Sequence, residues 1–397
     1  MREDGSDRDL DVVLVGATGF TGGLCADYLA RHMPEGLRWA LAGRDRSRLA
    51  AVRERLSRRD PSLSALRLLR VDVTDEASLA AVARRARVVA TTVGPYLQHG
   101  EPVVAACAAA GTDYVDLTGE PEFVDRMYLA HHAEAVRTGA RLVHCCGFDS
   151  VPHDLGALFT VERLPEGVPL RLRGMVRADA AFSGGTLASA LAAVSRGAQM
   201  RRVRAERRRV EPRPHGRRIR SVERPPHRDR ETGLWLAPLP TIDPLVVRRS
   251  AAALERYGPD FGYAHYAAFR RLPVMAGSVA GAGALVLAAQ AGPVRRVLQG
   301  RLPQGSGPSE ERRARSSFSV RFVGVGGGRT VVTEVRGGDP GYTETAKMLA
   351  ESALCLAFDD NPDTSGQVTT AAAMGTRLRE RLQRAGLQFL VLGDASA

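Results

Sequence analysis

The stretch LDVVLVGATGFTG, from Leu10 to Gly22, decides the fold of this chain. Its first six residues form a short and mostly apolar run, as expected of a strand buried on both faces. Gly16, Gly19 and Gly22 follow at once, three residues apart, and residues 24–32 have helical character. The first glycine permits a tight turn, the second lets the backbone approach a phosphate, and the third lets the helix pack closely on the strand. Because a helix N-terminus also attracts anions, this turn is predicted to bind a dinucleotide.

The alternation of strand and helix continues outward from this turn through residue 150. Strands are predicted at 10–15, 39–42, 66–71, 88–93, 114–117 and 141–144, and helices at 24–32, 47–57, 76–85, 101–110 and 122–138. Six short strands separated by helices indicate a parallel, doubly wound sheet. The fold class is therefore α/β, with a Rossmann domain over residues 1–150.

The end of the second predicted strand indicates which dinucleotide binds. NAD-binding chains usually place an acidic residue there to accept a hydrogen bond from the ribose 2′-hydroxyl. This chain has Gly43 and Arg44 instead, and an arginine fork can pair with a 2′-phosphate. The prediction is NADP(H), and the alternative is that Arg44 is simply a solvated arginine. The predicted cofactor contacts are Gly16, Ala17, Thr18, Gly19, Phe20, Thr21, Gly22, Arg44, Asp72, Val73, Thr92, Val93 and Gly94.

The alternating pattern stops after residue 150. Residues 151–340 are predicted to form an α+β substrate and dimerisation domain, with a strand at 169–176, a helix at 185–199 and a hairpin of 318–325 with 329–335. Residues 341–397 are predicted to return to the Rossmann domain as helices 343–357 and 370–384 and a strand at 388–392. An exposed strand in the second domain would make a homodimer plausible.

The charge of the chain is concentrated in one place. The whole chain carries +12, but residues 196–230 hold 14 arginines and 4 acidic residues and so account for +10 of it. Aromatic residues are 5% of the chain and absent from this basic segment, which argues against nucleic-acid binding by base stacking. Acidic carrier proteins and anionic membrane surfaces are the partners that such a segment suits.

Residues 272–294 form a second unusual segment, because none of them is charged. As a helix, 23 residues would reach about 34 Å, enough for a bilayer core. Four glycines and two prolines weaken that interpretation. Three alternatives stay open: a membrane-spanning helix, a helix lying at a membrane or lipid surface, and an ordinary buried helix or loop.

Composition excludes several classes of protein. At 44% hydrophobic and 25% charged residues, the chain of 397 residues is globular and long enough for two or three domains. Lys347 is the only lysine, so neither a P-loop nor the Tyr-x-x-x-Lys pair of short-chain dehydrogenases is present. Five cysteines without a Cys-x-x-Cys pair, no metal-binding motif and a charged N-terminus lead us to expect no metal, no disulfides, no secretory signal and a cytoplasmic location.

Several longer motifs make a resemblance specific. Besides the glycine turn and the LAGR of 41–44, they are the VGPY of 93–96, the CAAAGTDYVDLTGE of 107–120, the GFDSVPHD of 147–154, the SGGT of 183–186, the GDPGY of 338–342 and the AKMLA of 346–350. Through them the sequence resembles the saccharopine-dehydrogenase-like oxidoreductases, most closely the trans-acting enoyl reductases. The resemblance implies NADPH-dependent hydride transfer to a lipid or polyketide enoyl intermediate. In members of that family this serves glycolipid synthesis at the plasma membrane, so a peripheral location there is also implied.

Catalytic candidates follow from the chemistry of such a reduction. Hydride delivery to an activated C=C leaves an enolate, which needs a hydrogen-bond donor and then a proton. Such groups should lie where strands end at the nicotinamide. The candidates are Tyr96 as donor, held by the Gly94–Pro95 turn, together with Asp149 and His153 after the sixth strand. For each the alternative is structural: a packing ring, a helix cap and a buried histidine.

Three functions from different classes stay open at this stage. The first is an NADPH-dependent enoyl reductase acting on a carrier-bound or lipid-like acyl chain. The second is an NADP-linked dehydrogenase or imine reductase acting on a small substrate. The third is a non-catalytic NADP-bound module that associates with lipid. The basic and the uncharged segments favour the first and third over the second.

Overall fold

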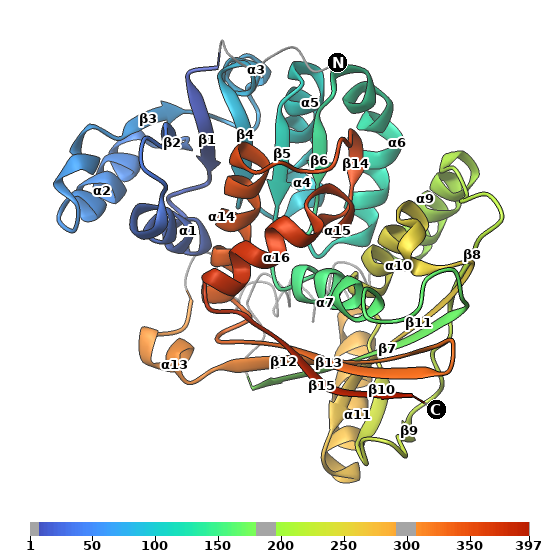
Figure 1. Cartoon of the computed structure of the whole chain (residues 1–397). Coiled ribbons are helices and arrows are strands. Elements are labelled where there is room, and N and C mark those ends of the chain that lie inside the picture. The colour runs from blue at the N-terminus through green and yellow to red at the C-terminus, as the bar shows by residue number, and fades with distance from the viewer. Residues whose placement is uncertain (1–7, 180–195, 291–306, 397) are drawn as a thin grey trace.

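The protein is described by a computed structural model, in which residues 8–179, 196–290 and 307–396 are placed. Two sheets form two domains, one above the other in Figure 1. The predicted helix at 185–199 and the SGGT motif lie wholly or largely outside the described residues, as do residues 291–294 of the uncharged segment.

The first domain is the predicted doubly wound parallel sheet. Its strands and helices are β1 (Leu10–Val15), α1 (Phe20–His32), β2 (Trp39–Gly43), α2 (Arg46–Ser57), η2 (Pro61–Ala65), β3 (Arg67–Arg70), α3 (Glu76–Arg85), β4 (Ala86–Thr91), α4 (Tyr96–His99), α5 (Glu101–Ala110), β5 (Asp113–Asp116), α6 (Pro121–Thr138) and β6 (Arg141–Val143). Every residue of β1 is buried, which explains its apolar run. A strand from the end of the chain, β14 (Gly366–Val368), joins this sheet. The strand order is β14-β6-β5-β4-β1-β2-β3, and all neighbours are parallel. The Rossmann prediction is confirmed.

The second domain is a mostly antiparallel sheet of eight strands. Its elements are α7 (Val151–Val161), β7 (Leu170–Asp179), α9 (Gly197–Val210), β8 (Arg218–Ser221), β9 (His227–Arg228), β10 (Trp235–Pro238), α10 (Asp243–Ala253), η3 (Glu255–Tyr257), β11 (Asp260–Phe269), α11 (Leu272–Gln290), α13 (Glu310–Ala314), β12 (Ser317–Gly326) and β13 (Arg329–Gly337). Phe318, Val320 and Phe322 alternate along β12 and are buried. The buried helix α7 packs on β12 and β13 and so separates this sheet from the first domain.

The C-terminal segment contributes to both domains. It contains α14 (Thr343–Phe358), β14 (Gly366–Val368), α15 (Thr370–Ala373), α16 (Gly375–Arg384) and β15 (Gln388–Ser396). Helix α14 packs on α1 and on β4, and β14 extends the first sheet beside β6. The terminal strand was predicted to return to the Rossmann domain, but β15 pairs with β13 in the second sheet. Sequence alone gives strand propensity and not the partner, which explains this error.

Candidate active site

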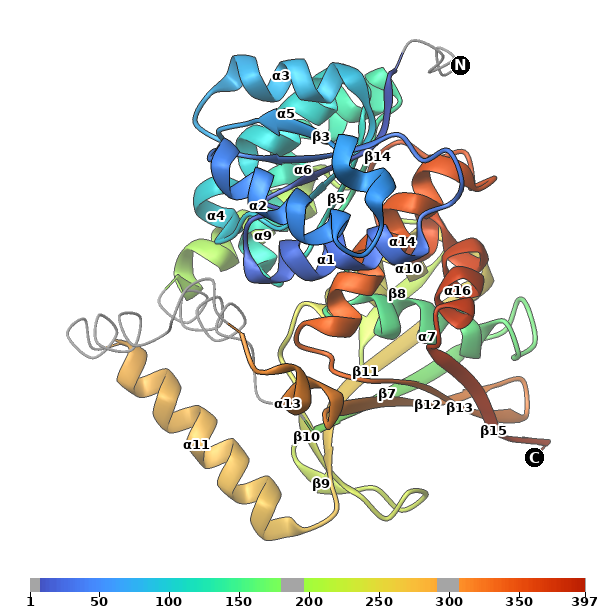
Figure 2. The same cartoon turned by 90° about the vertical axis from the view of Figure 1, so that its left-hand side faces the viewer.

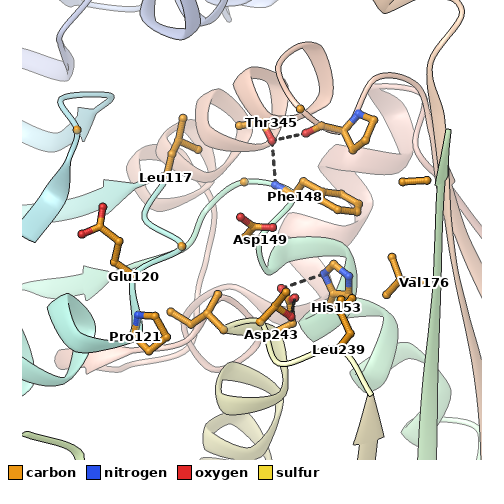
Figure 3. Close-up of a pocket in the computed structure, with 18 of the residues that line it drawn as sticks. Leu117, Glu120, Pro121, Phe148, Asp149, His153, Val176, Leu239, Asp243 and Thr345 are labelled. Carbon is orange, nitrogen blue, oxygen red and sulfur yellow. Dashed lines mark hydrogen bonds and ion pairs between the residues drawn. The ribbon is translucent and has the colours of Figure 1, made fainter. Parts of the chain in front are cut away.

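A continuous cavity of about 3200 Å³ runs between the two domains. At one end it is lined by the glycine turn after β1, and at the other by β11, β12 and the loop before α10. Figure 3 shows its central part, where Glu120, Asp149, His153 and Asp243 surround the space. The cavity therefore joins the predicted cofactor site to a chamber in the second domain.

The glycine turn is built for close approach of the backbone to a phosphate. Gly16 has a φ of +88°, which favours glycine, and its N–H donates to the Ala42 carbonyl at 2.9 Å. A Cβ on Gly22 would stand 2.1 Å from the Gly16 carbonyl oxygen, so only glycine lets α1 pack this closely. Gly19 caps α1 without a side-chain hydrogen bond to its free N–H groups. These groups are left for an anion, as the sequence predicts.

The fourth strand completes this end of the cavity. The Thr92 hydroxyl donates to the Gly16 carbonyl oxygen at 3.2 Å, which brings the loop after β4 against the glycine turn. This is the point at which the strand order reverses between β1 and β4, where doubly wound sheets bind their nucleotides. Thr92, Val93 and Gly94 all line the cavity there.

Most of the other predicted cofactor residues also line the cavity, and two do not. Arg44 is exposed and lines the cavity at the end of β2, the position at which the sequence predicts a 2′-phosphate contact. Ala17 is fully buried, and Asp72 does not line the cavity. The Asp72 carboxylate instead accepts hydrogen bonds from the backbone N–H (3.0 Å) and hydroxyl (2.8 Å) of Thr74, and these bonds lower its pKa. Asp72 thus caps a turn, while Val73 and Thr74 line the cavity.

Tyr96, which the sequence suggests as the hydrogen-bond donor, has another role in this structure. Its hydroxyl donates to the Thr91 carbonyl at 3.1 Å and accepts the Leu117 backbone N–H at 3.1 Å. Burial raises the pKa of the phenol well above its usual value. With both functions of the hydroxyl used by the backbone, Tyr96 holds the loops after β4 and β5 together, and the structure does not present it as a proton donor.

Among the predicted catalytic candidates, Asp149 has the surroundings that best suit a proton donor. It is mostly buried, lines the chamber, and no hydrogen bond joins its carboxyl to another described residue. Burial, with a smaller contribution from the charge of Asp243, raises its pKa to about 7. A carboxyl group with this pKa is partly protonated at neutral pH and can act as a general acid.

His153 lies in a buried cluster that the sequence did not reveal. Its Nδ1 lies 3.3 Å from Asp243 Oδ1, and His265 Nε2 lies 3.6 Å from Asp243 Oδ2. All three residues line the cavity. Burial lowers the pKa of His153 to about 4, so the ring is neutral at pH 7. The three residues come from α7, α10 and β11, and no local spacing could have connected them.

The basic segment at 196–230 is partly built into the fold. Arg207 is buried against Asp125 and Glu211, with its guanidinium 4.0 Å above the Tyr128 ring. Four residues of α9 and its N-cap line the cavity, and they lie four residues apart, on one face of the helix: Arg196, Met200, Arg204 and Arg208. Arg196 pairs with Glu122 at 2.7 Å. Helix α9 is therefore built into the fold, with one arginine-rich face toward the cavity.

Arg204, Arg208 and Arg248 form what we call the basic wall of the cavity. Burial and the charges of Arg208 and Arg248 lower the pKa of Arg204, and burial also lowers that of Arg248. Glu223 lies 3.9 Å from Arg248, and no acidic side chain among the described residues pairs with Arg204 or Arg208. The wall holds more positive charge than its surroundings neutralise, so it suits an anion.

Helix α11 contains most of the uncharged segment and projects away from the body of the protein (Figure 2). Leu272, Val274 and Val279 are 44–54% exposed, and Met275 is the one side chain of 272–284 that is buried. This excludes an ordinary buried helix for the described part of the segment. Among the described residues, no helix combines the length and hydropathy needed to cross a bilayer.

Known proteins resemble this chain in sequence and in structure. Residues 12–143 match the saccharopine dehydrogenase NADP binding domain. A Mycobacterium tuberculosis H37Rv protein, provisionally named a trans-acting enoyl reductase, is 38% identical over 96% of this chain and 97% of its own. The trans-acting enoyl reductase of Mycobacterium bovis BCG is 36% identical over the same shares of the two chains. Apo saccharopine dehydrogenase (L-Glu forming) from Saccharomyces cerevisiae covers 98% of this chain with a TM-score of 0.54 and 12% identity, which shows the fold alone.

The matching domain confirms NADP(H) as the cofactor, and the relatives confirm an NADP-dependent oxidoreductase. The residues at the cavity fit this cofactor, because the glycine turn is open to a phosphate and Arg44 stands at the end of β2. The chain belongs to the saccharopine-dehydrogenase-like oxidoreductases, in the group of the trans-acting enoyl reductases.

Proposed function

We propose that the protein reduces the activated C=C of a carrier-bound acyl chain with NADPH, in lipid or polyketide synthesis. The observation that supports this most is the cavity itself, which connects the nucleotide turn, an acidic group with a raised pKa and the basic wall. When bound, NADPH supplies the hydride that reaches the β-carbon of the enoyl group. The electron pair of the C=C then moves toward the thioester carbonyl, which leaves an enolate.

In this proposal Asp149 donates the proton that the α-carbon of the enolate takes up. Its carboxyl lies in the chamber within 3.0 Å of the position that a Cβ on Gly119 would occupy, so a glycine there leaves space beside the acid. After the reduction the carboxylate regains a proton from water through the cavity. Glu120 accepts the backbone N–H groups of Tyr96 (3.1 Å) and Leu97 (2.9 Å), so it positions the loop after β4.

The basic wall supplies the argument for a carrier-bound substrate. The acyl groups of carrier proteins and of coenzyme A are both attached through a phosphate-bearing pantetheine arm. Arginine guanidinium groups bind phosphates through paired, charge-assisted hydrogen bonds. Arg204 and Arg208 stand on the cavity face of α9, four residues apart, where such an arm would enter.

An NADPH-oxidation screen tests the reaction class. Enoyl thioesters should be reduced, whereas imines and ketones of small amino-acid-like substrates should not. Turnover of imines with no turnover of any enoyl thioester would instead support the dehydrogenase alternative. Binding of NADPH without turnover of any of these substrates would support the non-catalytic module.

Substitution of the basic wall tests the carrier. An Arg204→Ser, Arg208→Ser double variant should raise KM at least about tenfold for a coenzyme A or carrier thioester, since each charge-assisted hydrogen bond is worth about 1.5–3 kcal/mol. It should leave the KM for the phosphate-free N-acetylcysteamine thioester unchanged. Arg209→Ser is the matched control, because Arg209 is exposed on the same helix and does not line the cavity. Equal effects on the two thioesters would refute a role in phosphate binding.

We also propose that α11 places the protein at a lipid surface. Its side chains carry no charge, all of those at 272–284 except Met275 are exposed, and Arg270 and Arg271 precede it. Apolar burial and basic flanks together favour anionic membranes. Wild-type protein should co-float with anionic vesicles. Leu272→Glu with Ala276→Glu, two exposed positions outside the cavity lining, should abolish this without changing NADPH affinity. Unchanged flotation of the double variant would exclude α11 as the contact.

A further inference from the structure

We propose that His153, Asp243 and His265 form a binding site for one divalent transition-metal ion of the Zn²⁺ type. The three side chains are 1%, 2% and 1% exposed. One donor atom from each lies within 4.8 Å of the other two. Two imidazoles and one carboxylate are a ligand set that Zn²⁺ binds in open, three-ligand sites.

The donor atoms in this cluster lack other partners. Both ring nitrogens of His153, Oδ1 of Asp243 and Nε2 of His265 are buried, and no described residue lies in normal hydrogen-bond geometry to any of them. Buried polar atoms without partners are rare and costly, because each gives up its hydration without compensation. Three of these atoms come from three different residues of the cluster: His153 Nδ1, Asp243 Oδ1 and His265 Nε2. Their lack of hydrogen-bond partners indicates that something besides the protein completes the site.

The spacing of the cluster is too wide for a well-formed hydrogen-bonded triad. The gaps of 3.3 Å and 3.6 Å between the carboxylate oxygens and the ring nitrogens exceed normal N–H···O distances of about 2.7–3.2 Å. Tetrahedral ligands bonded to zinc at about 2.0–2.1 Å stand about 3.4 Å from one another. The three donor atoms lie within 4.8 Å of one another, so side-chain adjustments of about an ångström would bring them to this spacing. The same chain contains a real His–Asp hydrogen bond for comparison, since His144 Nδ1 lies only 2.6 Å from Asp116 Oδ2.

The surroundings of the cluster orient its donor atoms. The hydroxyl of Tyr263 lies 3.0 Å from His265 Nδ1, which leaves Nε2 to face the carboxylate. The Thr241 hydroxyl donates to Asp243 Oδ2, and Oδ1 stays open. Such outer contacts are typical of metal sites, where they fix the ring and carboxylate of each ligand.

The position of the cluster also gives an ion access and a use. All three ligands line the cavity, so an ion can enter from it and keep one coordination position toward it. An ion there could polarise the thioester carbonyl and stabilise the enolate. That consequence rests on the proposed reduction, whereas the binding of the ion does not.

The experiment measures metal binding to the full-length protein, without any substrate. Protein stripped with a chelator is titrated with Zn²⁺ by calorimetry and with Co²⁺ by visible absorption, and Mg²⁺ is the comparison. We expect one equivalent of Zn²⁺ to bind, intense tetrahedral Co²⁺ bands, and no binding of Mg²⁺, which prefers oxygen ligands. A wild-type protein that binds no Zn²⁺, or binds it no better than Mg²⁺, would overturn the proposal.

Variants assign the binding to these residues. Asp243→Asn and His265→Gln should each lower the affinity for Zn²⁺ at least ~100-fold. Tyr263→Phe should lower it about 10–100-fold, because Tyr263 orients the ligand His265. His99→Gln is the matched control, because His99 lines the same cavity outside the cluster. NADPH affinity reports whether each variant is folded; if Asp243→Asn and His265→Gln fail to fold, Tyr263→Phe against His99→Gln decides. Equal Zn²⁺ affinity in the cluster variants and the control would refute the site, whatever the enzyme reduces.

Discussion

The glycine turn allows a prediction with an internal control in the next residue. In Gly22→Ala the new Cβ would stand 2.1 Å from the Gly16 carbonyl oxygen and 2.8 Å from its carbonyl carbon, both backbone atoms. Ordinary contacts begin near 3.4 Å, so α1 must move away from β1 by more than an ångström. Overpacking of this kind costs about 1–3 kcal/mol, and more where the backbone itself must shift.

In Gly23→Ala the same methyl group meets only the Arg55 guanidinium, at 3.7 Å. Alanine is favoured over glycine inside a helix by about 0.5–1 kcal/mol. We therefore expect Gly23→Ala to stabilise the domain slightly and Gly22→Ala to destabilise it. The displaced turn would also lose phosphate contacts worth about 1.5–3 kcal/mol each. Of the two variants, only Gly22→Ala should therefore lower the affinity for NADPH, by about tenfold or more.

The assay can observe the first domain alone. The chain has 2 tryptophans, Trp39 in β2 and Trp235 in β10. In a Trp235→Phe background, urea unfolding followed by Trp39 fluorescence reports the Rossmann domain, and calorimetry reports NADPH affinity. Equal unfolding midpoints and equal affinities for the two alanine variants would refute the argument from close packing.

Three further predictions concern the cavity. Arg44→Ala should lower the affinity for NADPH about 10–150-fold, the equivalent of ~1.5–3 kcal/mol, and leave the affinity for NADH unchanged. Arg46→Ala is the control, because Arg46 does not line the cavity, and it should change neither affinity. Equal affinities of the wild type for the two dinucleotides would contradict the role of Arg44. Asp149→Asn should lower kcat about 10²–10⁴-fold and leave the NADPH affinity normal. The kcat of the wild type should fall as the pH rises past about 7, because Asp149 then loses its proton. A kcat that does not change across this pH range would contradict the role of Asp149 as the acid. Tyr96→Phe should lower the free energy of unfolding by ~1–2 kcal/mol, because two hydrogen bonds to the backbone are lost, and should change turnover little. A variant that is inactive but as stable as the wild type would show that Tyr96 takes part in the reaction.

The sequence predicted the first domain well because its signals are local. The apolar run of β1, the spacing of Gly16, Gly19 and Gly22, and the residue after β2 each act through neighbours in the chain. The same local logic predicted the hairpin of β12 and β13 around Gly327 and Gly328, which have positive φ.

The parts that the sequence could not predict depend on distant contacts. The phenol of Tyr96 finds its backbone partners only after two loops meet, and Asp243 reaches His153 and His265 only across three elements. The uncharged segment was ambiguous because composition does not say whether a neighbour covers a helix; the described part of α11 turns out to be exposed. Arg207 likewise counts as surface charge in the sequence and is buried in the fold.

The seventh strand of the first sheet has a consequence for the order in which the protein can fold. The edge of β6 is completed by β14, and Tyr28 of α1 hydrogen-bonds Glu351 of α14 at 2.6 Å, across 323 residues of chain. Buried Arg141 of β6 also donates to the Leu356 carbonyl at 3.0 Å. When only the nucleotide-binding half has emerged from the ribosome, the first sheet therefore has an unpaired edge at β6 and an apolar face that no helix covers. Native assembly of the first half has to wait until nearly the whole chain has been synthesised.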